Sequence, residues 1–181
     1  MQYAITKKTL NQNLQKHLVS HLSFDQIKYE KGENATTPDL AKKNKHGTLK
    51  SPDIKPGIKG NAFFVTDYNY GRFPEKVGWF ERTDPFSMSL WVFPDTLYQK
   101  VNLFTHCEEL RLGLKDILFI WRIINRNLSF PTPGLKMPLQ VTSTQMLPQN
   151  QWSMLTITYD GSSKAEGIEI FINGAQERTH Y

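Results

Sequence analysis

Segments in which apolar and polar residues alternate, separated by turn-forming residues, constrain this chain more than any other feature. The clearest is 86–92, where apolar residues at every second position alternate with Ser87 and Ser89. Because successive side chains of a β-strand point to opposite faces, this pattern predicts a strand with one buried face. Asn173-Gly174 follows the apolar segment 168–172 and predicts a type I′ hairpin turn, which needs positive φ at both central residues. The sequence therefore favours antiparallel strands.

Further segments with strand character follow at short spacing. Many are rich in β-branched and aromatic residues, which pack well on a pleated surface. We expect strands at 18–25, 48–49, 62–65, 101–105, 109–114, 117–123, 128–130 and 152–159, with a long polar loop over the rest of 26–58. The one helical signal is Leu10, Leu14 and Leu18 at i, i+4 spacing. The predicted fold class is all-β, an antiparallel β-sandwich (jelly roll) with a short N-terminal helical lead-in.

The ends of the chain set the expected domain organisation. We expect residues 1–17 to be a lead-in from a preceding region and residues 18–181 to form one sandwich, since 181 residues suit a single core. After Asn173-Gly174 only 175–181 remain, barely one return strand, which would leave a sheet edge exposed. The sandwich is therefore expected to be truncated at its C-terminus, or completed by sequence outside this chain.

Basic residues are concentrated in the first third of the chain. Residues 1–60 hold 11 lysines and 5 acidic residues, most densely at 42–46. No arginine or aromatic residue lies within 42–59 to stack on bases or read their edges, so we expect a solvated loop and no nucleic-acid partner. The longest apolar run, 117–121, is far shorter than a bilayer span, so no membrane insertion is expected. No signal peptide is readable at the N-terminus.

Three stretches resemble one family. Residues 80–92 resemble the strand F-x-R-T-D-x-F-S-x-S-x-W-V of laminin-G-like, concanavalin A-like jelly-roll modules. Residues 151–162 are similar to the family's x-W-x-x-v-x-x-T-Y-D-G-S, and residues 168–174 to its v-x-i-Y-v-D/N-G hairpin. Residues 21–25 and 56–62 fit its first strand and its P-G-k-x-G-x-A step, whereas 100–138 match poorly. The motifs occur in the family's order, which strengthens the resemblance.

The resemblance implies a setting as well as a fold. The Arg-Thr-Asp form resembles modules embedded in large bacterial proteins that also carry planctomycete-type cytochrome c domains. It implies an extracytoplasmic place, in the periplasm or at the cell surface, with neighbouring domains of a longer parent protein as partners. The implied function is a non-catalytic module that binds a carbohydrate or protein ligand. A structural spacer in a redox assembly is the alternative, and a carbohydrate-active enzyme is a further one.

Glycoside hydrolysis requires two carboxyl groups at a set distance from each other, and the sequence shows no such pair. The glucanases of this architecture place theirs on one strand in an E-x-D-x-E pattern, where alternate residues share a face, and the chain has no such pattern. Glu108 and Glu109 are adjacent, and Glu166 and Glu169 are three apart, so on a strand each pair would point to opposite faces. We therefore expect no catalytic residues.

Aromatic residues are the main lead to a ligand site. Tyr70 and Trp79 lie in a segment punctuated by glycine and proline, where exposed rings with Arg72 nearby could stack on a sugar and bind its hydroxyls. The alternative is that Trp79 and its neighbour Phe80 plug the end of the sandwich. Trp91 and Trp152 lie in alternating strands, and we assign both to packing.

Calcium is the one cofactor considered, because some laminin-G modules bind it through loop carboxylates and carbonyls. Asp160, in Asp160-Gly161-Ser162-Ser163, is the first candidate ligand and Asp67 the second. The alternative for Asp160 is an aspartate that caps its own turn through its side chain. No other cofactor is expected in this chain.

Overall fold

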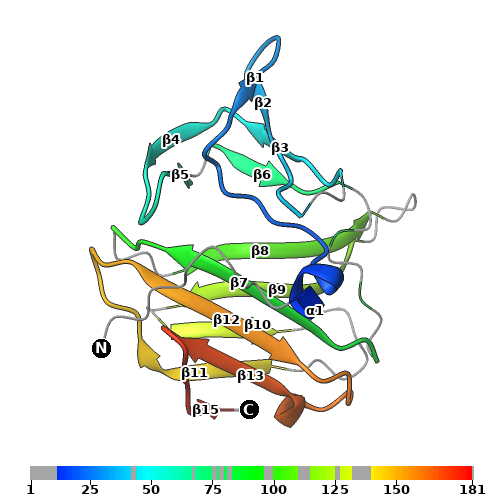
Figure 1. The fold of residues 1–181 in the computed structure, drawn as a ribbon. Helices are drawn as coiled ribbons and strands as arrows, with labels where there is room; N and C mark the ends of the chain where they lie inside the picture. Colours follow the sequence, from blue (N-terminus) through cyan, green and yellow to red (C-terminus); the bar gives the residue numbers. More distant parts are fainter. Residues whose placement is uncertain are drawn as a thin grey trace. The chain divides into compact units, whose positions relative to one another are not determined.

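The computed structural model describes residues 12–41, 44–66, 68–74, 77, 80, 83–95, 100–109, 115–124, 127–131 and 140–180. The chain forms two compact units, Met1–Val77 and Gly78–Tyr181, which are described separately below (Figure 1). Both are built from antiparallel strands, and the described part holds one short helix, α1 (Gln12–His17), and one 3₁₀ turn. The all-β fold class is confirmed, whereas the expected boundary between residues 17 and 18 stays a prediction.

The first unit contains two small sheets. Strands β1 (Lys28–Tyr29), β2 (Asn34–Thr37), β3 (Gly47–Lys50) and β6 (Tyr70–Arg72) form a sheet in the order β1-β2-β3-β6, and β4 (Asp53–Pro56) pairs with β5 (Asn61–Phe64). The expectation of a strand near Thr48-Leu49 is confirmed, but that of a loop over the rest of 26–58 is wrong. Strands of two to four residues are too short to show a readable period, and their cross-strand partners stabilise them instead.

The prediction of a strand at 18–25 is also wrong, because this segment bonds to Asp39 rather than along a neighbouring strand. Leu22 makes one isolated bridge with Asp39, and Phe24 has a φ of 61°, which is incompatible with an extended strand. The His21 N–H donates to Asp39 Oδ1 at 2.9 Å, and the same carboxylate accepts the N–H groups of Ala41 and Lys45. A buried aspartate therefore organises this segment in place of a neighbouring strand.

The second unit is a two-layer sandwich. One sheet has the order β14-β13-β12-β7, with β7 (Phe86–Val92), β12 (Ser153–Tyr159), β13 (Ile168–Ile172) and β14 (Ala175–Gln176). The other has the order β15-β11-β10-β9-β8, with β8 (Lys100–Glu109), β9 (Lys115–Ile124), β10 (Asn127–Pro131), β11 (Gln140–Met146) and β15 (Thr179–His180). In Figure 1, β7, β12 and β13 cross in front of the other sheet. Most strands expected here are confirmed, β11 was missed, and part of the strand expected at 109–114 lies outside the described residues.

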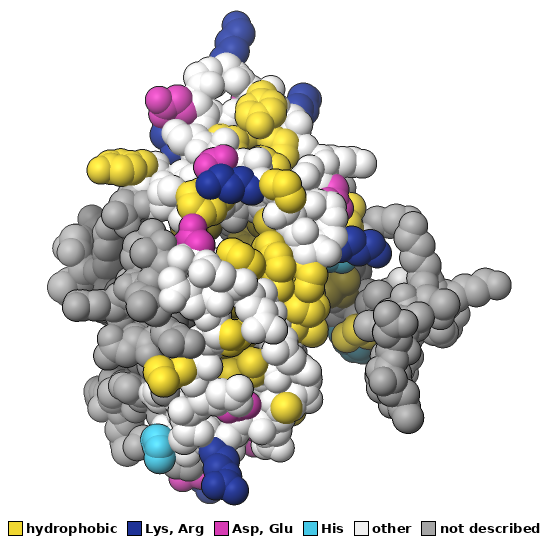
Figure 2. Space-filling model, turned by 90° about the vertical axis from the view of Figure 1, so that its left-hand side faces the viewer, with side chains coloured by type: hydrophobic (Ala, Val, Ile, Leu, Met, Phe, Trp, Pro, Cys, Tyr) yellow, Lys and Arg dark blue, Asp and Glu magenta, His cyan; other side chains and the backbone are white. Residues whose placement is uncertain are grey.

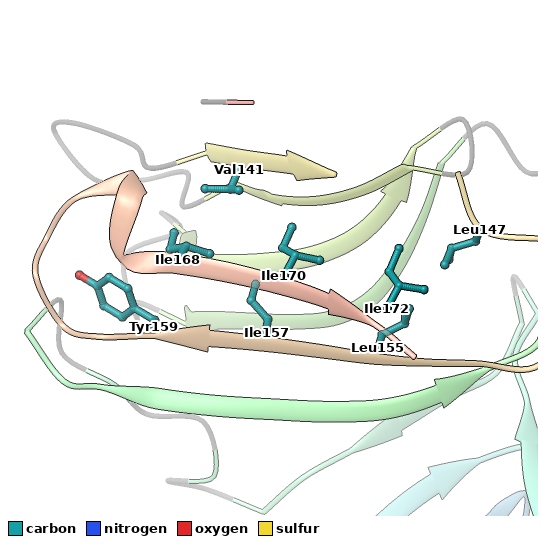
Figure 3. Close-up of a cluster of buried hydrophobic side chains, with 8 residues drawn as sticks. All are labelled: Val141, Leu147, Leu155, Ile157, Tyr159, Ile168, Ile170 and Ile172. Atoms are coloured by element: carbon teal, nitrogen blue, oxygen red, sulfur yellow. The ribbon is translucent and has the colours of Figure 1, made fainter. Parts of the chain in front are cut away.

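The core of the second unit lies between its two sheets. Inward side chains of β12 and β13 meet Val141 of β11 from the opposite layer (Figure 3). The register places Ile157 directly between Met88 of β7 and Ile170 of β13, so apolar residues form continuous rows across the sheet. Alternation along β12 is complete, with every second residue buried. Burial of this apolar surface is the main stabilising contribution to the unit.

The Asn173-Gly174 hairpin is confirmed. Asn173 has a φ of 53° and Gly174 a φ of 82°, the positive values that a type I′ turn requires. The turn is also bonded to the neighbouring strand, since the Met154 N–H donates to Asn173 Oδ1 and the Asn173 N–H donates to the Met154 carbonyl, both at 2.8 Å. These contacts hold the register of β12 against β13, and with it the direction in which each side chain of the sheet points.

Candidate functional site

Tyr70 and Arg72 lie on one face of strand β6, two residues apart. The Arg72 guanidinium carbon is 4.9 Å from the centroid of the Tyr70 ring, within the range of a cation–π contact. Tyr70 is 45% exposed and Arg72 is exposed as well. The structure thus brings together two of the three residues that the sequence analysis proposed for ligand binding.

Polar side chains surround this pair on the same face of the sheet. The register places Lys50 beside Tyr70, and it places Thr48, Thr36 and Lys28 in line with Arg72. None of these residues is buried. The face therefore combines an aromatic ring with hydroxyl and cationic groups, a combination that suits ligands with both apolar faces and polar edges.

An ion pair fixes one of the cations. Lys50 Nζ lies 2.7 Å from Glu33 Oε2, and the Ser51 hydroxyl donates to the same oxygen at 3.1 Å. The hydrogen bonds from Lys50 and then Ser51 hold the pKa of Glu33 below its usual range. Glu33 therefore stays ionised near neutral pH and positions Lys50 next to the Tyr70 ring.

The opposite face of the same sheet is packed, which holds the open face in place. Ala35 and Leu49 point to this side and are buried. A Cβ added at Gly71 would lie 3.3 Å from a Leu49 methyl carbon and 3.8 Å from the Phe63 ring, so the strand approaches its neighbours closely at this glycine. Gly71 itself is exposed, so this close approach is limited to the side of β6 that faces Leu49.

Two residues named from the sequence, Trp79 and Asp67, lie outside the described residues. Phe80, the neighbour of Trp79, packs on the core of the second unit, where its ring stacks on that of Phe86 with centroids 4.3 Å apart. For Phe80 the packing interpretation is therefore confirmed. The structure does not bear on the role of Trp79.

Asp160 holds its own turn. Its Oδ1 accepts the Ser162 N–H at 2.8 Å, and the hydrogen bonds from Ser162 hold the pKa of its carboxyl below the usual range. Gly161 has a φ of 80°, and a Cβ at Gly167 would collide with the Asp160 carboxylate. The geometry is that of a capped turn, the alternative considered for this residue.

A shallow open pocket of about 290 Å³ adjoins this turn, lined by Thr158, Tyr159, Asp160, Glu166, Gly167 and Glu169. Glu166 belongs to the 3₁₀ turn Ala165–Gly167 and Glu169 to β13, so the argument that two residues of one strand point to opposite faces does not apply to this pair. The pocket still lacks a metal-site geometry. In the described part of the chain no three His, Cys, Asp or Glu side chains lie close enough to hold one ion. Calcium at Asp160 stays a prediction.

The sequence analysis missed a second exposed aromatic group, on the outer face of the β14-β13-β12-β7 sheet. Trp91 is 46% exposed and Phe93 is 43% exposed, and the Phe93 ring lies 5.4 Å from that of Trp152. The assignment of Trp91 to packing is therefore wrong. The signal was present in the sequence, because Trp91 shares the odd-numbered positions of β7 with the polar residues Ser87 and Ser89. Figure 2 shows that hydrophobic side chains do lie at the surface of the described part.

Comparison with known proteins supports the family assignment. The sequence matches the family model described as the concanavalin A-like lectin/glucanases superfamily over residues 65–180, more than half of the chain. A search of curated proteins finds no match. No helix in the described residues is long and apolar enough to cross a membrane. The match covers all strands of the sandwich, together with the strand that carries Tyr70 and Arg72. The chain belongs to the concanavalin A-like lectin/glucanase superfamily.

Proposed function

We propose that the chain is a non-catalytic binding module whose ligand is a glycan held at the open face of the β1-β2-β3-β6 sheet. The observation that carries this proposal is the exposed Tyr70 ring with the Arg72 guanidinium beside it, on the edge strand that pairs with β3. An aromatic ring can stack on the C–H face of a sugar, while guanidinium and hydroxyl groups bond to its oxygens. The superfamily supports a binding role, although it also contains glucanases.

The carboxyl groups that the structure describes support the non-catalytic role that we propose. A glycosidase needs a general acid with a raised pKa beside a second carboxylate. Asp160, which lines the pocket with Glu166 and Glu169, is poorly suited to be the general acid, because the hydrogen bonds from Ser162 lower the pKa of its carboxyl. We therefore propose that the acidic side chains of this pocket serve the structure of the turn rather than catalysis.

The setting of the module is part of the same proposal. Its Arg-Thr-Asp motif supports a place within a larger extracytoplasmic protein with cytochrome c domains, where a glycan or protein ligand would be bound at the cell surface. Western blotting of cell fractions with an antibody to this module tests the setting. A larger species in the periplasmic or surface fraction is expected, and a species confined to the cytoplasm would contradict it.

The ligand is tested by screening the protein on a glycan array as wild type, Tyr70→Ala and Tyr29→Ala. Tyr29 is the matched control, an exposed tyrosine of the same sheet whose position on β1 alternates with Lys28 and faces the other side. We expect Tyr70→Ala to weaken binding about tenfold or more and Tyr29→Ala to leave it unchanged. If no glycan is retained and both variants change only stability, the spacer function replaces this proposal.

A further inference from the structure

The outer face of the β14-β13-β12-β7 sheet carries a second, separate set of exposed groups. The register places Trp91 opposite Met154, and just beyond the ends of these two strands the ring centroids of Phe93 and Trp152 are 5.4 Å apart. Both pairs lie at the same end of β7 and β12 and point away from the core. We name the three aromatic residues Trp91, Phe93 and Trp152, together with Met154, the aromatic strip.

Hydrogen-bonding groups continue from the aromatic strip along the same face. The Ser89 and Thr156 hydroxyls are 2.7 Å apart, and the Gln176 amide donates to Glu169 Oε1 at 3.1 Å. The Thr158 hydroxyl donates to Glu169 Oε2 at 3.4 Å. Hydroxyl, amide and carboxylate groups that already bond to one another are held in place, and each retains capacity to bond a ligand.

The side chains on this face are more exposed than those on the core side of the same strands. All described outer residues of the four strands are exposed or half-buried, whereas the inner residues of β12 and β13 are buried. The outer residues are Ser87, Ser89, Trp91, Met154, Thr156, Thr158, Glu169, Phe171 and Gln176. Exposed aromatic rings beside ordered polar groups on a sheet mark a binding surface rather than packing.

The charged and hydrogen-bonding groups of this face indicate which class of ligand it can bind. It carries one carboxylate, Glu169, and no lysine or arginine among the outer residues of these four strands. A sulfated or uronic acid polymer would therefore meet no cation and one like charge. An uncharged sugar polymer offers C–H faces for the rings and hydroxyls for Ser89, Thr156 and Gln176.

We infer that the outer face of the β14-β13-β12-β7 sheet is a binding site for an uncharged polysaccharide, with the aromatic strip stacking on the sugar rings. A protein partner fits less well, because the outer residues beyond the aromatic strip are polar apart from Phe171. This site lies in a different unit from Tyr70 and Arg72 and does not depend on the function proposed for them.

The test is affinity electrophoresis of the full chain in native gels containing galactomannan, xyloglucan or dextran, with alginate as the anionic comparison. Wild type, Trp91→Ala, Phe93→Ala and Tyr70→Ala are run side by side. Phe93 follows the end of β7, so its replacement tests the strip even if Trp91→Ala fails to fold. Thermal unfolding of each variant identifies such a failure.

We expect at least one neutral polymer to retard the wild type, and Trp91→Ala and Phe93→Ala to weaken that retardation about tenfold. Tyr70→Ala should retain it. Retardation by alginate alone, or neutral-polymer binding that survives both strip substitutions, overturns the inference. Loss through Tyr70→Ala alone would overturn it as well while supporting the function proposed for the first unit. Self-association that Trp91→Ala abolishes, without retardation in any gel, would assign the face to a second copy of the chain.

Discussion

Replacement of Ile157 by alanine tests the core of the second unit quantitatively. Ile157 is fully buried and packs in a row with Met88 and Ile170. The substitution removes three carbon groups, each contributing about 0.8 kcal/mol of transfer free energy. The cavity left between two sheets adds to this, so we expect the free energy of unfolding to fall by about 3–5 kcal/mol. For a unit of this size the melting temperature should fall by roughly 15 °C or more.

Tryptophan fluorescence is the right assay, because all four tryptophans lie in the second unit and report its unfolding alone. Thr156→Ala is the matched control, since Thr156 is the next residue of β12 and points outward. It loses the hydroxyl contact with Ser89, which should cost about 1 kcal/mol or less. Equal destabilisation by Ile157→Ala and Thr156→Ala would refute the assignment of inner and outer faces, and with it the orientation of the aromatic strip.

Two further predictions concern turns. Gly60 has a φ of 68°, and a Cβ there would collide with the Asp25 carboxylate, so Gly60→Ala should speed hydrogen exchange across 53–64. Gly32→Ala is the control, because Gly32 also has a positive φ, of 80°, but lies in open space. It should have a smaller effect on hydrogen exchange around its own turn. Equal effects would show that the Asp25 contact is unimportant. The lowered pKa of Asp160 stabilises the fold above the usual aspartate pKa, and this stability is lost as the pH falls through the lower folded value. Urea unfolding of Asp160→Asn below pH about 4 should therefore show a weaker pH dependence than the wild type, and an unchanged dependence would contradict the role of Ser162.

The sandwich could be predicted from the sequence where strands are long enough to show their period. Residues 86–92 alternate over seven positions, and the Asn173-Gly174 turn has a backbone requirement that few residue pairs meet. Strands β1, β2 and β6 hold two to four residues each, so their existence depends on partners distant in the sequence. No local pattern contains that information.

The candidate sites divide in the same way. Tyr70 and Arg72 could be proposed together because they are two residues apart, and any strand would place them on one face. The aromatic strip joins residues about sixty positions apart, and only the pairing of β7 with β12 brings Trp152 to Phe93. Trp91 is a different case, because a place in a clear strand does not by itself indicate burial, whereas the position it shares with Ser87 and Ser89 indicates the outer face.

We propose that this superfamily member binds glycans without cleaving them. Incubating the protein with each polysaccharide that retards it, and measuring bound protein and newly formed reducing ends in the same sample, tests both binding and cleavage. We expect saturable retention with no reducing ends above the level without protein. Release of reducing ends that tracks the protein through purification, or the absence of retention on every polymer, would contradict the claim.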